Sequence, residues 1–229
     1  MSAPGIVLQH DPEAPPALLA DWLGERRIPW RLVELWHEPV PDIEGAAFAV
    51  ALGSEHSAGA RAPSFIPREI ALLRRAVECR IPVLGLCFGA QALAIALGGR
   101  VQPADPIEIG WDEIESLAPD RVPPGRWLNF HYESFTMPPG AELLARSPAG
   151  PAAFALGAHL GVQFHPEATP EIADGWARSE SRRVPEIDLG HVAVEGHLHG
   201  PDAARRATIL FERWWRCAGR AVAASAHAA

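Results

Sequence analysis

Cys87 stands at the junction of two predicted elements, and its setting favours a nucleophilic role. The apolar residues 82–86 predict a buried strand, and a helix is predicted directly afterwards over residues 90–97. Gly85 and Gly89 flank the cysteine, where a Cβ would crowd a sharp turn. This pattern is typical of a nucleophile elbow, which presents the side chain at its apex at the N-terminus of a helix. The helix dipole and the nearby N–H groups favour thiolate over thiol there.

The other two cysteines lack this setting. Cys79 falls inside a predicted helix and Cys217 near the end of another, so we interpret both as packing residues. Three cysteines without a CxxC pair fit neither a disulfide framework nor a zinc knuckle and are typical of a reducing compartment. The first residues also lack the basic start and long apolar core of a signal peptide. We therefore expect a cytoplasmic protein without a bound metal.

A cysteine nucleophile needs a base, and the base needs a group that orients it. Among the ten histidines, His165 follows an apolar stretch predicted as a strand over residues 161–163, and Glu167 comes shortly after it. Open α/β sheets place their active crevice at such strand ends. Glu167 would accept a hydrogen bond from one ring nitrogen and leave the other facing Cys87. The alternative is a surface histidine with an unrelated glutamate.

Three further histidines gather late in the sequence. His191, His197 and His199, with Glu195 between them, suggest a metal site at first sight. Their spacing fits no zinc signature, so we interpret this segment as a solvated loop before the last helix.

Short apolar stretches alternate with helical patterns in the first half of the chain. Strands are predicted at residues 6–9, 30–35, 46–52 and 82–86, and helices at residues 17–26, 67–79 and 90–97. This alternation indicates a mostly parallel sheet that is covered by helices on both faces. The fold class is therefore α/β with an open sheet.

The second half of the chain changes character. Short strands separated by Pro-Gly turns are predicted at residues 107–114, 127–131, 152–156 and 161–163, which indicates a small antiparallel section. Helices return at residues 171–178 and 202–217. No change of composition marks a linker, so we expect one domain over residues 1–217. The Ala-rich residues 218–229 are predicted to be a disordered tail.

The charges exclude several classes of function. The formal net charge of −8 disfavours nucleic acid and anionic membranes as partners. All 20 basic residues are arginine, and without lysine the chain has neither Schiff-base chemistry, nor a pyridoxal attachment site, nor a Walker-type phosphate loop. We expect no cofactor and a small-molecule substrate.

Five motifs in the same order resemble those of the class I glutamine amidotransferases, in particular their stand-alone, GMP-synthase-like branch. They are GLCFGAQ at residues 85–91, EIGW at 108–111, NFHYESF at 129–135 with MPPG at 137–140, LARS at 144–147 and QFHPE at 163–167. The resemblance extends from about Leu52 to Trp176 and implies a flavodoxin-like sheet.

The resemblance implies a catalytic triad of Cys87, His165 and Glu167. The Cys87 thiolate would attack the side-chain amide of glutamine and form a γ-glutamyl thioester. His165 would protonate the departing ammonia and then activate the water that releases glutamate. Glu167 would hold the histidine in the required tautomer.

The resemblance also implies an oxyanion hole made of two backbone N–H groups. One belongs to Phe88 and the other to Ser54, in the loop after the strand predicted at residues 46–52. Here the chain departs from its family, since residues 53–55 read Gly-Ser-Glu where the family usually has Gly-Gly-Pro. The family further implies that four residues bind the amino-acid end of the substrate: Gly53, Gln91, Tyr132 and Glu133. For Glu133 a solvated surface charge is the alternative.

Three functions remain open. The chain could be a glutaminase subunit that passes ammonia to a separate ATP-dependent synthetase, because it carries no phosphate loop of its own. It could instead hydrolyse or transfer the γ-glutamyl group of another small γ-glutamyl compound, as relatives with this architecture do. A catalytically silent binding module is the third possibility, and the intact triad argues against it.

Overall fold

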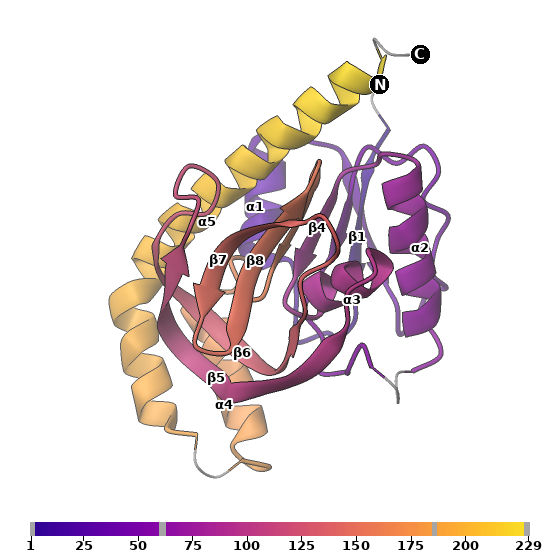
Figure 1. Cartoon of the computed structure of the whole chain (residues 1–229). Helices are drawn as coiled ribbons and strands as arrows, with labels where there is room; N and C mark the ends of the chain where they lie inside the picture. The colour runs from indigo at the N-terminus through magenta and orange to yellow at the C-terminus, as the bar shows by residue number, and fades with distance from the viewer. Residues whose placement is uncertain (1–2, 60–62, 185–186, 227–229) are drawn as a thin grey trace.

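The computed structural model describes residues 3–59, 63–184 and 187–226. In this part of the chain nine strands form one sheet in the order β2-β1-β3-β4-β9-β8-β7-β5-β6 (Figure 1). The strands are β1 (Gly5–Gln9), β2 (Trp30–Glu34), β3 (Ala49–Ala51), β4 (Val83–Leu86), β5 (Val101–Ser116), β6 (Gly125–Phe135), β7 (Glu142–Ser147), β8 (Gly150–Leu156) and β9 (His159–Val162). The helices are α1 (Ala17–Glu25), α2 (Ile66–Glu78), α3 (Phe88–Ala96), α4 (Pro170–Glu180) and α5 (Leu189–Ala226).

The first half of the chain builds a parallel sheet, as predicted. Strand β1 pairs in parallel with β2 and β3, and β4 pairs in parallel with β3 and β9. Every residue of β1, β3 and β4 is buried, which explains why these strands are continuous apolar stretches without alternation. Because β1, β3 and β4 run parallel, their carboxyl ends meet at one edge of the sheet. His10, Gly53 and Cys87 follow these ends.

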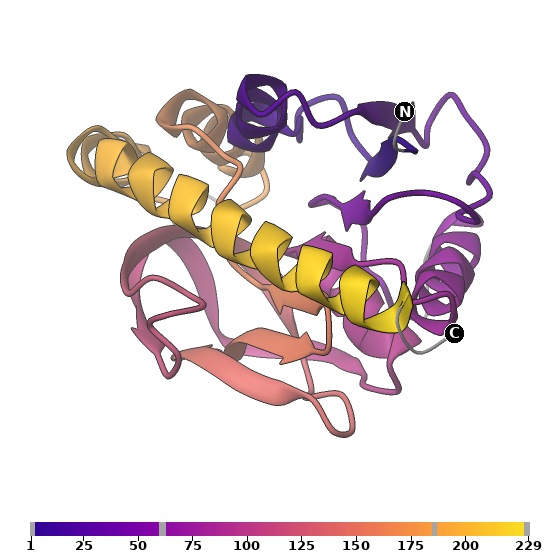
Figure 2. The same cartoon turned by 90° about the horizontal axis from the view of Figure 1, so that it is seen from above.

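Helices cover both faces of this parallel sheet (Figure 2). Helices α1 and α5 pack on one face, where Leu23 and Trp214 join the cluster that contains Val7 of β1. Helices α2 and α3 pack on the other face, in the cluster that contains Ile6 and Leu8. Successive β1 residues alternate between the two clusters, as the period of a strand requires. The predicted α/β architecture is confirmed.

An antiparallel section completes the sheet. Strands β5 and β6 pair with each other, β7 pairs with β5 and β8, and β8 pairs with β9, all antiparallel. Strands β5 and β6 are longer than the stretches we predicted, and β7 was not predicted as a strand. The antiparallel section thus joins the parallel strands through β9, immediately before His165.

The last helix begins earlier and ends later than the stretch predicted at residues 202–217. Helix α5 begins at Leu189 and continues to Ala226, so it includes both the expected loop before residue 202 and most of the expected tail. Gly196 and Gly200 lie inside this helix and allow it to pack closely on its neighbours. A Cβ on Gly200 would lie 2.4 Å from a Pro170 side-chain atom, and one on Gly196 would lie 3.2 Å from the Trp111 ring nitrogen. Tertiary packing therefore overrides the low helix propensity of glycine. Residues 227–229 lie outside the described residues.

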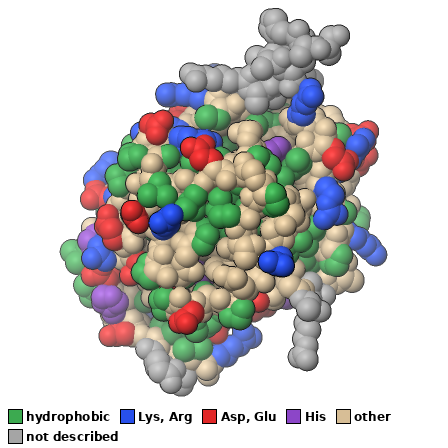
Figure 3. Space-filling view, viewed as in Figure 1, with side chains coloured by type: hydrophobic (Ala, Val, Ile, Leu, Met, Phe, Trp, Pro, Cys, Tyr) green, Lys and Arg blue, Asp and Glu red, His purple; other side chains and the backbone are tan. Residues whose placement is uncertain are grey.

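Acidic and basic side chains are interspersed on the molecular face toward the viewer, rather than gathered by sign (Figure 3). None of the helices within the described ranges is long and apolar enough to cross a membrane.

Candidate active site

Cys87 occupies a strained position between β4 and α3. Its φ of 51° and ψ of −107° lie outside the regions that L-residues ordinarily adopt. The neighbouring backbone leaves no room for a side chain at residue 85, since a Cβ on Gly85 would lie 2.4 Å from the Gly89 carbonyl oxygen. A Cβ on Gly89 would lie 2.0 Å from the carbonyl oxygen of Ala51. These contacts explain both flanking glycines and give Cys87 the strand–turn–helix setting of an elbow. Strain of this kind is typical of functional sites.

Two backbone hydrogen bonds tie the elbow to its neighbours. The N–H of Cys87 donates to the Val162 carbonyl on β9 at 2.8 Å, and the N–H of Gly89 donates to the Leu52 carbonyl at 3.1 Å. Phe88 is the first residue of α3, so its N–H has no acceptor within the helix. The elbow therefore leaves the Phe88 N–H available for a ligand.

His165 is held by Glu167 at the end of β9. The ring Nδ1 donates to Glu167 Oε1 at 2.8 Å, and the side chains of both residues are almost fully buried. Burial alone would lower the pKa of His165, but the Cys87 sulfur and the Glu167 carboxylate outweigh it and raise this pKa to about 10. Trp176 packs edge-on against the imidazole, with 4.7 Å between ring centroids. Because Glu167 binds Nδ1, the other ring nitrogen, Nε2, is available to hydrogen-bond with Cys87.

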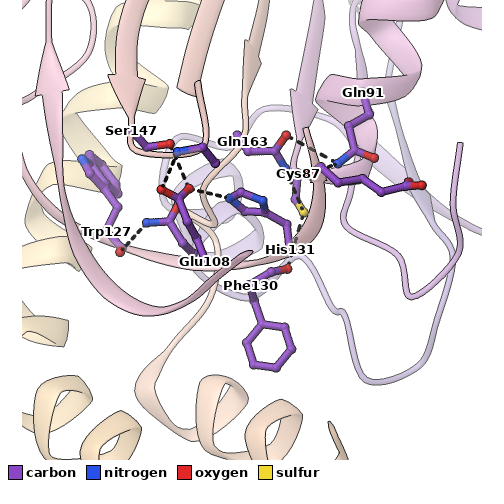
Figure 4. A network of polar contacts seen from close by, with 11 residues as sticks. Cys87, Gln91, Glu108, Trp127, Phe130, His131, Ser147 and Gln163 are labelled. Atoms are coloured by element: carbon purple, nitrogen blue, oxygen red, sulfur yellow. Dashed lines mark hydrogen bonds and ion pairs between the residues drawn. The ribbon is translucent and has the colours of Figure 1, made fainter. Parts of the chain in front are cut away.

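Two further groups contact the cysteine, and neither was predicted from the sequence. Gln163 donates from Nε2 to the Cys87 sulfur at 3.5 Å, and the same sulfur lies 3.9 Å from the Phe130 carbonyl oxygen (Figure 4). Gln163 lies in the motif that contains His165, so its place in an otherwise apolar strand end was the available signal. A backbone carbonyl such as that of Phe130 has no side-chain signature.

One cavity of about 600 Å³ brings the predicted residues together. Its lining includes the predicted nucleophile and base, both predicted oxyanion donors and all four predicted substrate contacts: Cys87, His165, Ser54, Phe88, Gly53, Gln91, Tyr132 and Glu133. Glu167 lies behind His165 and is not part of the lining. Cys79 and Cys217 do not contribute to it.

Comparison with known proteins gives a family for this arrangement. Residues 56–176 match the model of the family "Glutamine amidotransferase class-I". The chain belongs to this family. An alignment over 98 positions shows 42% identity to a glutamine-hydrolysing GMP synthase of Thermomicrobium roseum, and one over 128 positions shows 30% identity to that of Ralstonia pickettii. The alignments cover 40% and 48% of this chain but only 19% and 24% of the two relatives, so the chain spans about a quarter of their length or less.

Solved amidotransferase structures match nearly the whole chain. A glutamine amidotransferase from Methylobacillus flagellatus has a TM-score of 0.82 and 25% identity, and the match covers 95% of both chains. A glutamine amidotransferase from Thermotoga maritima shares the fold with a TM-score of 0.83 at 21% identity, over 93% of this chain and 98% of its own.

The loop that departs from the family pattern lies opposite the elbow. A Cβ on Gly53 would lie 2.8 Å from Cε1 of His165, so glycine is required here by close approach. Ser54 does not have a positive φ. Its hydroxyl accepts a hydrogen bond from the His56 N–H at 3.1 Å. The N–H of Glu55 donates to Asp11 Oδ2 at 3.1 Å. The serine therefore fits the loop without backbone strain.

Glu133 is engaged within the site. Both of its carboxylate oxygens lie 2.8 Å from the Ser57 hydroxyl, and its backbone carbonyl accepts from Gln91 Nε2 at 2.9 Å. The alternative interpretation, a solvated surface charge, does not describe this position. Tyr132 donates to Glu180 at 3.2 Å, and burial together with this carboxylate raises the pKa of the phenol to about 12.

A buried polar cluster supports strand β6 and joins three of the sequence motifs (Figure 4). Glu108 lies 2.9 Å from His131 Nε2, and it accepts from the Ser147 hydroxyl at 2.8 Å and from the Ala149 N–H at 3.2 Å. Burial raises the pKa of Glu108, but these contacts outweigh it and lower the pKa below its ordinary value. Because His131 adjoins Phe130, the cluster helps to hold the backbone that faces the Cys87 sulfur.

The late histidines lie along α5 rather than in a loop. His199 pairs with Glu195 one helical turn earlier, with 3.1 Å between Nε2 and Oε2. Over the described residues, the potential ligand atoms that do cluster belong to Asp11, Glu55 and His56 instead.

Proposed function

We propose that the chain hydrolyses the side-chain amide of glutamine through a γ-glutamyl thioester on Cys87. The observation that carries this proposal is the strained cysteine, which shares one cavity with a histidine that is itself oriented by a buried carboxylate. A thiol, an imidazole and a carboxylate in this order form a nucleophile, a base and an orienting group.

The first half of the reaction transfers the acyl group to sulfur. The Cys87 thiolate attacks the amide carbon, and the negative charge moves to the carbonyl oxygen, which the Phe88 and Ser54 N–H groups stabilise. His165 gives its Nε2 proton to the amide nitrogen as the C–N bond breaks, and ammonia leaves. The products of this half are ammonia, a γ-glutamyl thioester and a neutral imidazole.

The second half releases glutamate. The neutral His165 removes a proton from water as its oxygen attacks the thioester carbon. The tetrahedral intermediate collapses with cleavage of the C–S bond, which returns Cys87 to thiolate and His165 to imidazolium. Gln91 and the backbone at Tyr132 and Glu133 hold the amino-acid end of the substrate. The ammonia passes to a separate ATP-dependent synthetase.

The size of the cavity favours a second candidate. A volume of about 600 Å³ is in the range that accommodates drug-sized ligands, which are larger than glutamine. The same triad would then hydrolyse or transfer the γ-glutamyl group of another small γ-glutamyl compound, with an amine rather than ammonia as the leaving group.

A substrate screen separates the two candidates. The pure protein is incubated with glutamine and with a panel of γ-glutamyl compounds, each with and without synthetases from the same source, and released glutamate is followed. Ammonia release from glutamine that rises when a synthetase is added supports the subunit. Robust hydrolysis of another γ-glutamyl compound without any partner supports the second candidate. Absence of glutamate release under all these conditions would contradict both.

A further inference from the structure

A third buried histidine–carboxylate pair, besides His165–Glu167 and His131–Glu108, lies beside the active site but outside the cavity lining. His10 follows β1, and Glu69 belongs to the first turn of α2. His10 Nε2 lies 2.9 Å from Glu69 Oε2, and the side chains of both residues have no solvent exposure. The other ring nitrogen, Nδ1, lies 3.0 Å from the carbonyl oxygen of Gly53.

This pair needs an explanation other than stability. Two charged groups lose their hydration when they are buried together, and well-packed apolar residues are often equally or more stabilising in their place. What distinguishes this pair is the two groups that it connects. His10 joins a carboxylate on α2 to a backbone carbonyl in the loop that contains Gly53 and Ser54.

The direction of the hydrogen bond to Gly53 is determined by chemistry. A carbonyl oxygen can only accept, so His10 Nδ1 carries the proton and donates. Burial would lower the pKa of His10, but Glu69 and the Gly53 carbonyl outweigh it and raise the pKa. The imidazole is therefore maintained as a donor toward the loop.

This bond determines the orientation of one peptide group. The carbonyl of Gly53 and the N–H of Ser54 belong to the same planar, trans peptide and point in opposite directions. With the carbonyl held on the His10 side, the Ser54 N–H points to the other side of the peptide. Gly53 and Ser54 both line the cavity with Cys87, and Gly53 closely approaches the His165 ring.

His10 also contacts the residue that carries the second N–H group. Its ring packs edge-on against the Phe88 ring, with 4.7 Å between centroids. One buried side chain thus contacts the peptide group that carries the Ser54 N–H, through the Gly53 carbonyl, and the side chain of Phe88.

We propose that His10, supported by Glu69, is a positioning residue that holds the Ser54 N–H toward the cavity as a preformed oxyanion donor. This inference rests on the proposed function. It also explains the serine at the position where the family usually has glycine, because a peptide held in one orientation does not need the conformational freedom of glycine.

A matched pair of double variants tests this role. In H10L/E69L an apolar pair of similar size replaces the buried ions, so folding is expected to persist. H10N/E69L differs only at residue 10, where the Asn side-chain nitrogen can take the place of Nδ1 and donate to Gly53. We expect kcat for glutamate release to fall about 10–100-fold in H10L/E69L, which is less than the roughly 10²–10³-fold loss when an oxyanion donor itself is removed. KM should change little, and H10N/E69L should recover most of kcat.

H159N provides the control for replacing a buried histidine. His159 is buried at the start of β9, the opposite end of that strand from His165, so its substitution should leave kcat unchanged. Equal kcat losses in H10N/E69L and H10L/E69L, or no loss in H10L/E69L, would overturn the proposal.

The ratio of two labelling rates at Cys87, by iodoacetamide and by a diazoketone, makes the test independent of turnover. Iodoacetamide alkylates a thiol without forming an oxyanion, whereas the diazoketone analogue of glutamine reacts beside a carbonyl that the oxyanion donors polarise. H10L/E69L should react with iodoacetamide at the wild-type rate and with the diazoketone at least about tenfold more slowly. A wild-type protein that hydrolyses no γ-glutamyl compound would contradict the proposed function, while this ratio would still decide the role of His10. Parallel changes in both labelling rates would overturn that role.

Discussion

The two sides of the active-site cavity are built in different ways. The Cys87 elbow is formed by consecutive residues, 85–91, and backbone contacts with Ala51, Leu52 and Val162 hold it in place. The loop of Gly53 and Ser54 is held instead by side chains that are distant in sequence, His10 and Asp11 after β1 and Glu69 on α2. The proposed nucleophile and the Phe88 N–H therefore belong to one local motif, whereas the orientation of the other proposed oxyanion donor, the Ser54 N–H, depends on side-chain contacts between distant segments.

The largest effect is expected on the elbow side. Replacement of Cys87 with serine keeps the shape of the side chain but removes the thiolate, so glutamate release should fall by about 10⁴-fold or more. Thermal unfolding measures the accompanying change in stability, which should stay within about 1 kcal/mol, or a few degrees in Tm. Substantial activity in the purified serine variant would show that Cys87 is not the nucleophile.

His165 lies between the two sides, and its charge depends on Glu167. We expect Glu167→Gln to reduce kcat by about 10³-fold, because the orienting carboxylate is lost. The raised pKa of His165 predicts that wild-type activity declines as the pH rises through about 10, where the imidazolium that we propose protonates the leaving amide nitrogen loses its proton.

Glu167→Gln should also shift the pH at which kcat declines on the alkaline side of its pH profile (the alkaline limb). Without the carboxylate the pKa of His165 falls, so the limb of the kcat profile should shift to lower pH in the glutamine variant. Measurement of kcat against pH for both proteins tests this directly. An unchanged alkaline limb would mean that another group controls it.

A smaller effect is expected on the loop side. Gly53→Ala places a Cβ 2.8 Å from the His165 ring, so either the loop or the imidazole must move. Misplacement by about 1 Å can reduce the rate about 10²-fold, and we expect a loss of up to that size. Gly24→Ala in α1 is the matched control, because nothing lies within 4 Å of its new Cβ. Full activity of the Gly53 variant, measured by glutamate release, would show that the close approach is unimportant.

This contrast also explains which features were predictable from sequence. Residues 82–97 specify an apolar strand, two small residues and a helix, so the position of Cys87 followed from local pattern. His165 and Glu167 were predictable because they are neighbours at a strand end. The parallel sheet followed from the alternation of strands and helices.

The missed features depend on contacts between distant segments. His10 and Glu69 are far apart in sequence and acquire a shared role only when β1 and α2 meet. The start of α5 depends on such contacts as well, since Gly196 and Gly200 have low helix propensity but permit close packing against Trp111 and Pro170 in the fold.

The thioester itself tests the central claim most directly. Wild-type protein is mixed with glutamine, quenched in acid within the first turnover and digested, and its peptides are analysed by mass spectrometry. We predict that the peptide containing Cys87 gains the mass of one glutamyl group, while the peptides with Cys79 and Cys217 remain unmodified. A glutamyl group on any other residue, or glutamate release without modification of Cys87, would contradict the account.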